Sequence, residues 1–357
     1  MKVSSSLSGP FYSIFFVCLI MILNSLASVQ AGNKMYIATG DSNEIIIVDL
    51  ASNRVIGSIG ELENAHGLAG HPSSDFLVAG SMHTGKKDQP GKPASVSEDE
   101  HKAHHAAGAS ASHAAQTSAL SIVHPVHGHV MRRITVEGLT HHTAVSADGK
   151  HAAAVHSFLG KVSIVNLDTF TLVKTVKIGD MPNYAVFNAT GSRLYISNAA
   201  SGTVSVIDTQ NWTKTADIKV GKGPEHMAIN KNGDQLYVLN VIEGSVSVIN
   251  TANQESVDKI KVGKSPHGIA LNEAKSSLYV SNKGDHSVTS VNLKSGQSRT
   301  VKISPAPYHL EYIPSTDKIY LSSREKPLIW VLNPDSLEIV QEIEFKQGVA
   351  HQMVVMD

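Results

Sequence analysis

The chain is built by repeating one segment, and the clearest copy, residues 264–282, reads KSPHGIALNEAKSSLYVSN. A turn containing Pro266 leads into the short strand HGIAL, a polar reversal follows, and LYVSN alternates apolar with polar residues. The next segment, SVTSVNLKSGQSRTVKI, supplies two more alternating strands. Four short strands with a turn at each junction, within roughly 40 residues, are typical of one β-propeller blade.

Six complete copies of this unit occur along the chain. They span residues 61–138, 139–179, 180–221, 222–263, 264–303 and 304–345. Residues 35–59 supply three strands that lack an inner strand, and residues 348–356, GVAHQMVVM, form a lone inner strand. Pairing the two ends within one blade closes the ring and removes exposed sheet edges. The sequence therefore predicts an all-β, seven-bladed β-propeller over residues 32–357, with N-/C-terminal closure of one blade.

The second and third strands of the fourth to sixth blades carry closely similar text. They read LYISNAASGTVSVIDT, LYVLNVIEGSVSVINT and LYVSNKGDHSVTSVNL. Together with the preceding PxGIA-like turns, this text resembles the YVTN-type β-propeller repeat over nearly all of residues 32–357. The resemblance implies the fold, but the family includes surface-layer proteins, relatives of enzymes and metal-handling proteins, so it leaves the function open.

The first 31 residues have the features of a secretory signal peptide. Lys2 provides a positive start, FYSIFFVCLIMIL is an apolar run, and small residues lie around Ala31. We expect residues 1–31 to be removed and the mature protein to be periplasmic or secreted. The alternative is an uncleaved membrane anchor, which the short apolar run disfavours.

Cysteine usage restricts the chemistry of the mature chain. The only cysteine, Cys18, lies within the predicted signal peptide. Its removal excludes disulfides, covalently attached c-type haem, thiolate zinc sites and blue copper centres. Any metal must then be held by histidine and oxygen ligands, and the chain has 19 histidines. With 30 basic and 31 acidic residues, no net field favours nucleic acid or anionic lipid as a partner.

Residues 85–117 interrupt the second blade with a segment that has almost no large apolar side chain. Such a segment cannot bury enough surface to fold, so we interpret it as a flexible, His-rich insertion. Its histidines, which are suited to metal capture, are His101, His104, His105 and His113. A solubilising linker with incidental histidines is the alternative.

Histidines also recur where the inner strands begin, in one of two adjacent positions in six of the seven blades. They are His66, His141, His142, His226, His267, His309 and His351. Because the inner strands line the central channel, these side chains are predicted to gather at one channel mouth. His156, which replaces the Asn of LYVSN in the third blade, is expected on the same face, with His83 and His286. Adjacent strand positions point to opposite faces, so convergence of every histidine does not follow from sequence.

Neutral imidazoles in a ring are ligands for zinc or copper. The candidate ligands are His66, His141, His142, His156, His226, His267, His309 and His351. Glu225, Asn183, Tyr184 and Tyr308 lie at equivalent positions and can supply oxygen atoms. By contrast, His124, His127 and His129 fall in a turn between third and fourth strands and are predicted to face the other way.

The layout of signal, histidine tract and channel-mouth histidines resembles periplasmic zinc metallochaperones of the AztD type. That resemblance implies a protein that carries zinc or copper for delivery to a periplasmic metal-transport protein, or for storage. We expect a monomer and favour a role without catalysis, while the sequence leaves catalysis open. A second hypothesis is a metal- or haem-dependent oxidoreductase-like propeller, with a copper cluster or haem d1. A third is a metal-free interaction scaffold. We find no GxSxG, phosphate-binding glycine loop or HExxH that would indicate a hydrolase or nucleotide enzyme.

Overall fold

The structure is a computed structural model that describes residues 34–83 and 117–356. The predicted signal peptide and histidines 101, 104, 105 and 113 of the insertion lie outside the described residues. The last residue of the predicted insertion, Thr117, begins a strand. Within the described ranges, we found no helix with the length and apolar character needed to cross a membrane.

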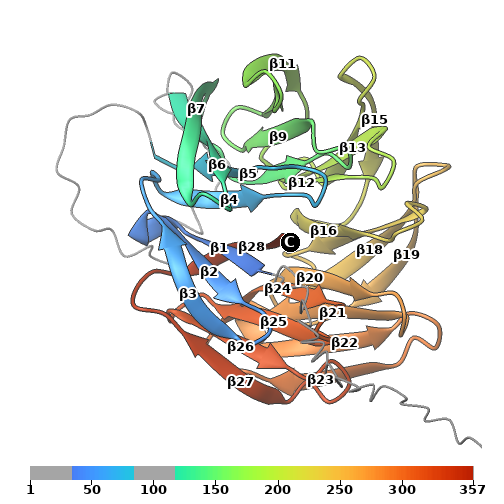
Figure 1. Cartoon of the computed structure of the whole chain (residues 1–357). Helices are drawn as coiled ribbons and strands as arrows, with labels where there is room; N and C mark the ends of the chain where they lie inside the picture. Colours follow the sequence, from blue (N-terminus) through green and yellow to red (C-terminus); the bar gives the residue numbers. More distant parts are fainter. Residues whose placement is uncertain (1–33, 84–116, 357) are drawn as a thin grey trace, which may run out of the picture. The chain divides into compact units, whose positions relative to one another are not determined.

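Seven four-stranded antiparallel sheets form the blades (Figure 1). The first blade consists of β28 (Ala350–Met356), β1 (Lys34–Thr39), β2 (Glu44–Asp49) and β3 (Arg54–Ile59). The second consists of β4 (Ala65–Ala69), β5 (Leu77–Ser81), β6 (Thr117–His124) and β7 (His129–Glu137). The third consists of β8 (Thr143–Val145), β9 (His151–His156), β10 (Lys161–Asn166) and β11 (Thr171–Lys177).

The remaining four blades follow in chain order, each from inner to outer strand. The fourth consists of β12 (Pro182–Phe187), β13 (Arg193–Asn198), β14 (Thr203–Asp208) and β15 (Thr213–Lys219). The fifth consists of β16 (Pro224–Ile229), β17 (Gln235–Asn240), β18 (Ser245–Asn250) and β19 (Glu255–Lys261). The sixth consists of β20 (Pro266–Asn272), β21 (Ser277–Asn282), β22 (Ser287–Asn292) and β23 (Ser298–Lys302). The seventh consists of β24 (Pro307–Ile313), β25 (Lys318–Ser323), β26 (Leu328–Leu332) and β27 (Ile339–Glu344).

The ring closes through the two ends of the chain. β28 is the inner strand of the first blade and pairs with β1, where Ile37 lies opposite Met353. In Figure 1 the red β28 accordingly lies beside the blue β1. The predicted all-β, seven-bladed propeller with terminal closure is therefore confirmed.

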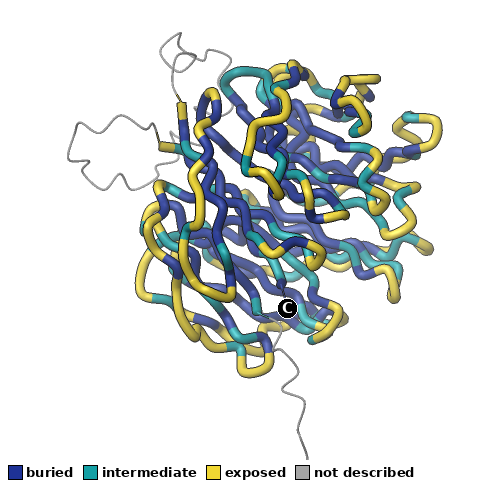
Figure 2. The backbone as a smooth tube through the Cα atoms, turned by 45° about the horizontal axis from the view of Figure 1, so that its top comes forward, coloured by how far each residue is buried: buried dark blue, intermediate teal, exposed yellow. Residues whose placement is uncertain are grey.

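The hydrophobic core lies between neighbouring blades. Second and third strands are almost entirely buried, while the outermost strands are exposed over most of their length (Figure 2). The large side chains that wedge between blades include Trp330, Tyr195 and Tyr279, each at most 2% exposed. Both faces of the second and third strands are therefore buried, so the serines that alternate with the β-branched residues, such as Ser205 and Ser247, are buried as well.

An asparagine at the end of the second strand fixes the connection between blades. In the fifth blade, Asn240 accepts a hydrogen bond from the Gly221 N–H at 3.0 Å and donates to Ser245 and Ser247 at 3.1 and 2.9 Å. Asn198 and Asn282 make the same three kinds of bond in their own blades. In these three blades the LYVSN text therefore encodes the joint that holds the turn before the inner strand in place.

Candidate metal centre

A β-bulge at the start of the inner strands turns adjacent side chains towards the channel. In the fourth blade, Pro182 pairs with Asn198 and Ala185 pairs with Ile196, so two residues oppose one. Similar register shifts occur in β4, β16, β20, β24 and β28. Because a bulge re-aims one side chain relative to a regular strand, two neighbouring positions can serve the same side. The alternation expected from a regular strand is therefore wrong at this point.

The serine of the LYVSN text stabilises the bulge. The oxygens of Ser197, Ser281 and Ser322 accept hydrogen bonds from the backbone N–H groups of Tyr184, Gly268 and His309 at 3.1, 2.7 and 3.0 Å. The bulge interrupts the ladder, so these N–H groups need another acceptor, and the serine hydroxyl supplies it. The repeat thus encodes both the bulge and its acceptor.

Seven histidines form a closed circle of ring contacts around the channel. Starting at His351, successive ring centroids lie 4.1, 4.5, 4.2, 4.8, 4.3, 4.8 and 5.9 Å apart. The order is His351, His66, His141, His142, His226, His267, His309 and back to His351. All are buried except the partly buried His66. The sequence-predicted histidines of the inner strands are therefore brought together.

Three groups within this circle have ligand atoms no more than 4.8 Å apart: His66, His141 and His142; His142, His226 and His309; and Glu225, His226 and His267. His142 and His226 each belong to two of these groups, and their Nε2 atoms lie 3.3 Å apart. Two nitrogens bound to one tetrahedral zinc at about 2.0–2.1 Å would lie about 3.3–3.4 Å from each other. The spacing therefore fits shared coordination of one ion.

Backbone carbonyls hold several imidazoles in a ligating tautomer. His142 donates from Nδ1 to the carbonyl oxygen of Asn183 at 2.8 Å, and His66 donates from Nδ1 to that of His141 at 3.1 Å. A carbonyl oxygen only accepts, so the proton lies on Nδ1 and the Nε2 lone pair remains for a ligand or neighbour. Metal-ligating histidines commonly have this second partner.

Burial keeps three histidines of the centre neutral. It lowers the pKa of His226 to about 3. It also holds the pKa values of His142 and His309 well below the usual 6.5, and repulsion from neighbouring imidazoles lowers both further. A neutral imidazole has a lone pair that an imidazolium lacks, so the environment favours coordination at neutral pH.

Oxygen-bearing side chains flank the circle. Glu225 is 1% exposed on its side chain, and its Oε2 lies 3.5 Å from His267 Nδ1. Tyr308 stacks on His267 with ring centroids 3.9 Å apart. The Arg324 guanidinium lies over the Tyr308 ring, 5.4 Å from its centroid. Sequence reasoning named Glu225 and Tyr308, whereas Arg324 gave no signal because it lies in a strand-end loop.

His156 does not join the centre, contrary to the prediction that it is a metal ligand. It is fully buried, its Nδ1 donates to the Leu139 carbonyl at 3.2 Å, and its Nε2 accepts from the Ser163 hydroxyl at 2.8 Å. Ser163 occupies the position of Ser205 and Ser247 in later blades, so His156 takes the place of the asparagine beside this serine, although it donates to a backbone carbonyl where Asn240 accepts from a backbone N–H. Both ring nitrogens are engaged, so no lone pair remains for a metal.

The other histidines lie apart from the circle. His286 follows the turn after β21, where its Nδ1 accepts from the Ala306 N–H at 2.9 Å, and His83 is exposed. His124, His127 and His129 occupy the β6–β7 turn, with successive ring centroids 4.3 and 6.1 Å apart. Since β6–β7 turns and inner-strand starts lie at opposite ends of antiparallel strands, this turn faces away from the centre, as predicted.

A cavity of about 780 Å³ occupies the channel beyond the circle. Tyr184 forms its inner end, with its ring 5.1 Å from His142 and 4.7 Å from His226. Glu311 also lines it, and burial raises the pKa of this carboxyl to about 8. Sequence reasoning missed Glu311, whose only signal is a lone acidic residue in the strand text PYHLEYI.

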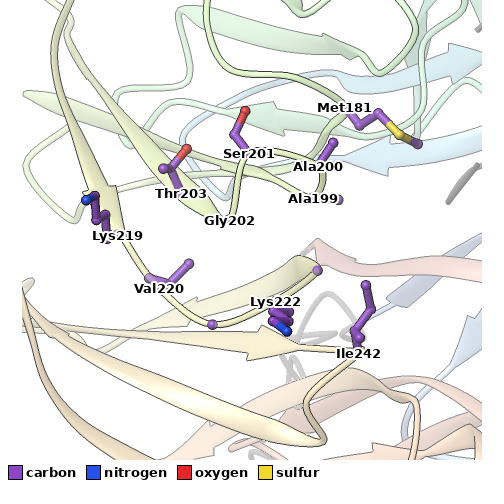
Figure 3. Close-up of a pocket in the computed structure, with 12 residues that line it drawn as sticks. Met181, Ala199, Ala200, Ser201, Gly202, Thr203, Lys219, Val220, Lys222 and Ile242 are labelled. Carbon is purple, nitrogen blue, oxygen red and sulfur yellow. The ribbon is translucent and has the colours of Figure 1, made fainter. Parts of the chain in front are cut away.

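A separate hollow of about 570 Å³ lies between the fourth and fifth blades (Figure 3). Met181, Lys219, Lys222 and Ile242 surround it, together with small residues of the β13–β14 turn. Its described lining contains no histidine or carboxylate, so it has none of the ligands that define the centre.

Comparison with known proteins supports the fold and leaves the activity open. No protein-family model matches the chain, and no curated protein matches it. Kuenenia stuttgartiensis hydrazine synthase is similar at 15% identity and TM-score 0.65, over 85% of this chain and 93% of that one. A putative 6-phosphogluconolactonase from Bacteroides uniformis reaches 16% and 0.67, over 91% and 100%. A dihydro-haem d1 dehydrogenase in complex with DHE reaches 12% and 0.61, over 90% and 75%. Identities this low show a shared propeller fold alone.

Proposed function

We propose that this protein is a metal-binding propeller that holds zinc or copper at the histidine circle as cargo. The observation that carries the proposal is the pair His142 and His226. Their Nε2 atoms lie 3.3 Å apart, and the Asn183 carbonyl fixes the proton of His142 on the opposite ring nitrogen. The Nε2 atom of His142 therefore keeps its lone pair, and the separation of the two Nε2 atoms suits shared coordination of one tetrahedral ion.

An unpartnered nitrogen supports the same proposal. His309 Nε2 is buried in the group that contains His142 and His226, and the described residues offer it no hydrogen-bond partner. Leaving a buried polar atom unsatisfied costs about 1–3 kcal/mol. A coordinated ion, or a water bound to that ion, would satisfy such atoms, which gives the cluster a reason to persist in a buried position.

Equilibrium dialysis of the metal-free full-length protein against zinc tests the proposal. We expect one ion per chain to bind tightly, and His226→Gln or His142→Gln to weaken binding by at least about tenfold because each removes one ligand. His127→Gln, in the exposed β6–β7 turn, is the matched control and should bind as the parent does. Equal binding by the parent and both circle variants would contradict the proposal.

The role we propose for the ion is delivery or storage outside the cytoplasm. This role rests on the signal-like first 31 residues and the histidine-rich residues 85–117, whose layout resembles the AztD-type zinc metallochaperones. The recipient would be a periplasmic metal-transport protein. Transfer of zinc from loaded protein to a candidate recipient, at a rate above that of free dissociation into a chelator, is the result expected for delivery.

A second candidate function is a metal- or haem-dependent oxidoreductase, and the names of two structurally similar proteins motivate it. One is a hydrazine synthase and the other is a dihydro-haem d1 dehydrogenase. A visible absorption spectrum of protein isolated from its native host separates the candidates, because a copper cluster or haem absorbs visible light and zinc does not. A colourless, zinc-loaded protein would exclude the redox candidate.

A further inference from the structure

The channel cavity beyond the histidine circle has the form of a ligand site. Its volume of about 780 Å³ lies within the range of about 300–1,000 Å³ that is usual for small-molecule sites. Its walls come from the later parts of six inner strands and are mainly small or apolar, as at Val145, Ala185 and Met353. The cavity opens at the strand ends opposite the histidines, where Ala189 is exposed at its rim.

Three neighbouring polar side chains line this cavity from within the inner strands, whereas His71, Asn188, Asn230 and Lys231 line it just beyond the ends of those strands. Glu311 lies two residues after His309 on β24, and the ionised form of this carboxyl would raise the pKa of Tyr184. The Gln352 side chain lies against Tyr184 as well, while its Oε1 accepts the Leu68 N–H at 2.8 Å. A carboxyl group, an aromatic ring and an amide therefore face the same space.

Glu311 makes no ion pair with a described residue, and the cationic Lys231 that also lines the cavity is exposed beyond the end of β16. Its side chain is partly exposed to the cavity, and no ion pair or side-chain hydrogen bond within residues 34–83 and 117–356 involves it. Carboxyl groups in apolar surroundings are costly unless they have a partner. Burial alone raises the pKa of this carboxyl to about 8, and a cation beside it would favour the ionised form. An acid without a protein partner at this position therefore points to a cationic partner from outside the chain.

Carboxylate and aromatic groups together are suited to an organic ammonium group. The carboxylate pairs with the charge and accepts its N–H groups, the ring of Tyr184 attracts a cation, and apolar walls cover a hydrocarbon body. A hydrated divalent ion fits poorly, because Val, Ala and Met side chains cannot replace its water ligands. An anionic ligand would gain no charge pairing with Glu311.

We propose that the channel cavity binds a small organic amine, with its ammonium group between Glu311 and Tyr184 and its hydrocarbon portion against the apolar walls. This site is separate from the histidine circle. It does not depend on the metal proposal, since it requires no ion.

Calorimetric titration of the metal-free full-length protein with 2-phenylethylamine tests the site, with 2-phenylethanol as the uncharged analogue. We expect saturable binding of the amine and at least about tenfold weaker binding of the alcohol. Glu311→Gln keeps the side-chain shape and should weaken amine binding at least about tenfold, while leaving alcohol binding within about twofold. Glu344→Gln, on the exposed outer strand of the same blade, should bind as the parent does.

A second pair of variants keeps the test independent of Glu311. Ala189→Trp narrows the exposed rim and should reduce binding of both compounds, whereas Ala200→Trp, in an exposed turn at the other end of the same blade, should not. Absence of saturable amine binding up to about 10 mM, equal binding of amine and alcohol, or no effect of Glu311→Gln would each overturn the proposal. Zinc dialysis of the same samples reports the histidine circle separately.

Discussion

Replacing His156 by the asparagine of the other blades should make folding less sensitive to acid. Burial lowers the pKa of His156 to about 4 in the folded protein, against 6.5 for an ordinary histidine. The unfolded chain therefore binds a proton between about pH 6.5 and pH 4 that the folded protein does not bind. The residue's contribution to stability is complete above pH 6.5 and falls as the pH is lowered through this window.

The expected size follows from the shift. A difference of about 2.5 units at about 1.36 kcal/mol per unit corresponds to about 3 kcal/mol lost between pH 7.5 and pH 4. Asparagine does not titrate, so His156→Asn should lose about 3 kcal/mol less than the parent over this range. At pH 7.5 it should be within about 1 kcal/mol of the parent, because an asparagine amide can donate to the Leu139 carbonyl and accept from the Ser163 hydroxyl as His156 does.

Urea unfolding at both pH values measures the difference, and His127→Asn in the exposed β6–β7 turn is the control. The control should follow the parent at each pH. If His156→Asn lost as much free energy of unfolding as the parent on acidification, the assignment of His156 as a neutral, structural histidine would be refuted.

Three further substitutions test the joints that position the histidine circle, each measured as the free energy of unfolding in urea. Ser281→Ala removes the acceptor of the buried Gly268 N–H and should cost about 1–3 kcal/mol, so a loss below about 0.5 would contradict the role given to this serine. Gly268→Ala would place a Cβ 2.6 Å from the Tyr308 carbonyl oxygen and should cost about 1–3 kcal/mol; an unchanged stability would show that the blades are less tightly packed. Asn240→Ala loses the bond to the Gly221 N–H and two serine bonds and should cost about 3 kcal/mol, whereas a neutral effect would remove the asparagine joint from the account.

The architecture was predictable because the same turn and strand sequence patterns recur in each blade. Turns, alternating strands and the LYVSN text recur at a fixed period, and the lone inner strand at the C-terminus indicated closure with β1. Repeat folds are readable in this way because each unit packs chiefly on its neighbours.

The candidate site was predictable in membership but not in geometry. Periodic histidines indicated one end of the channel, but the convergence of adjacent positions depends on the bulge, which the serine at the end of β13 or β21 encodes only indirectly. His156 was misassigned because its sequence position suits the channel face, while its hydrogen bonds to Leu139 and Ser163 appear only in three dimensions. Glu311 was missed because one acidic residue in a strand has no periodic signal.

X-ray absorption at the zinc edge of the loaded protein tests the central claim most directly. The account predicts three or four nitrogen or oxygen ligands at about 2.0–2.1 Å, with outer-shell scattering from at least two imidazole rings, and the loss of one ring in His226→Gln. A spectrum of hydrated zinc without imidazole scattering, or one unchanged by His226→Gln, would contradict the histidine circle as the metal centre.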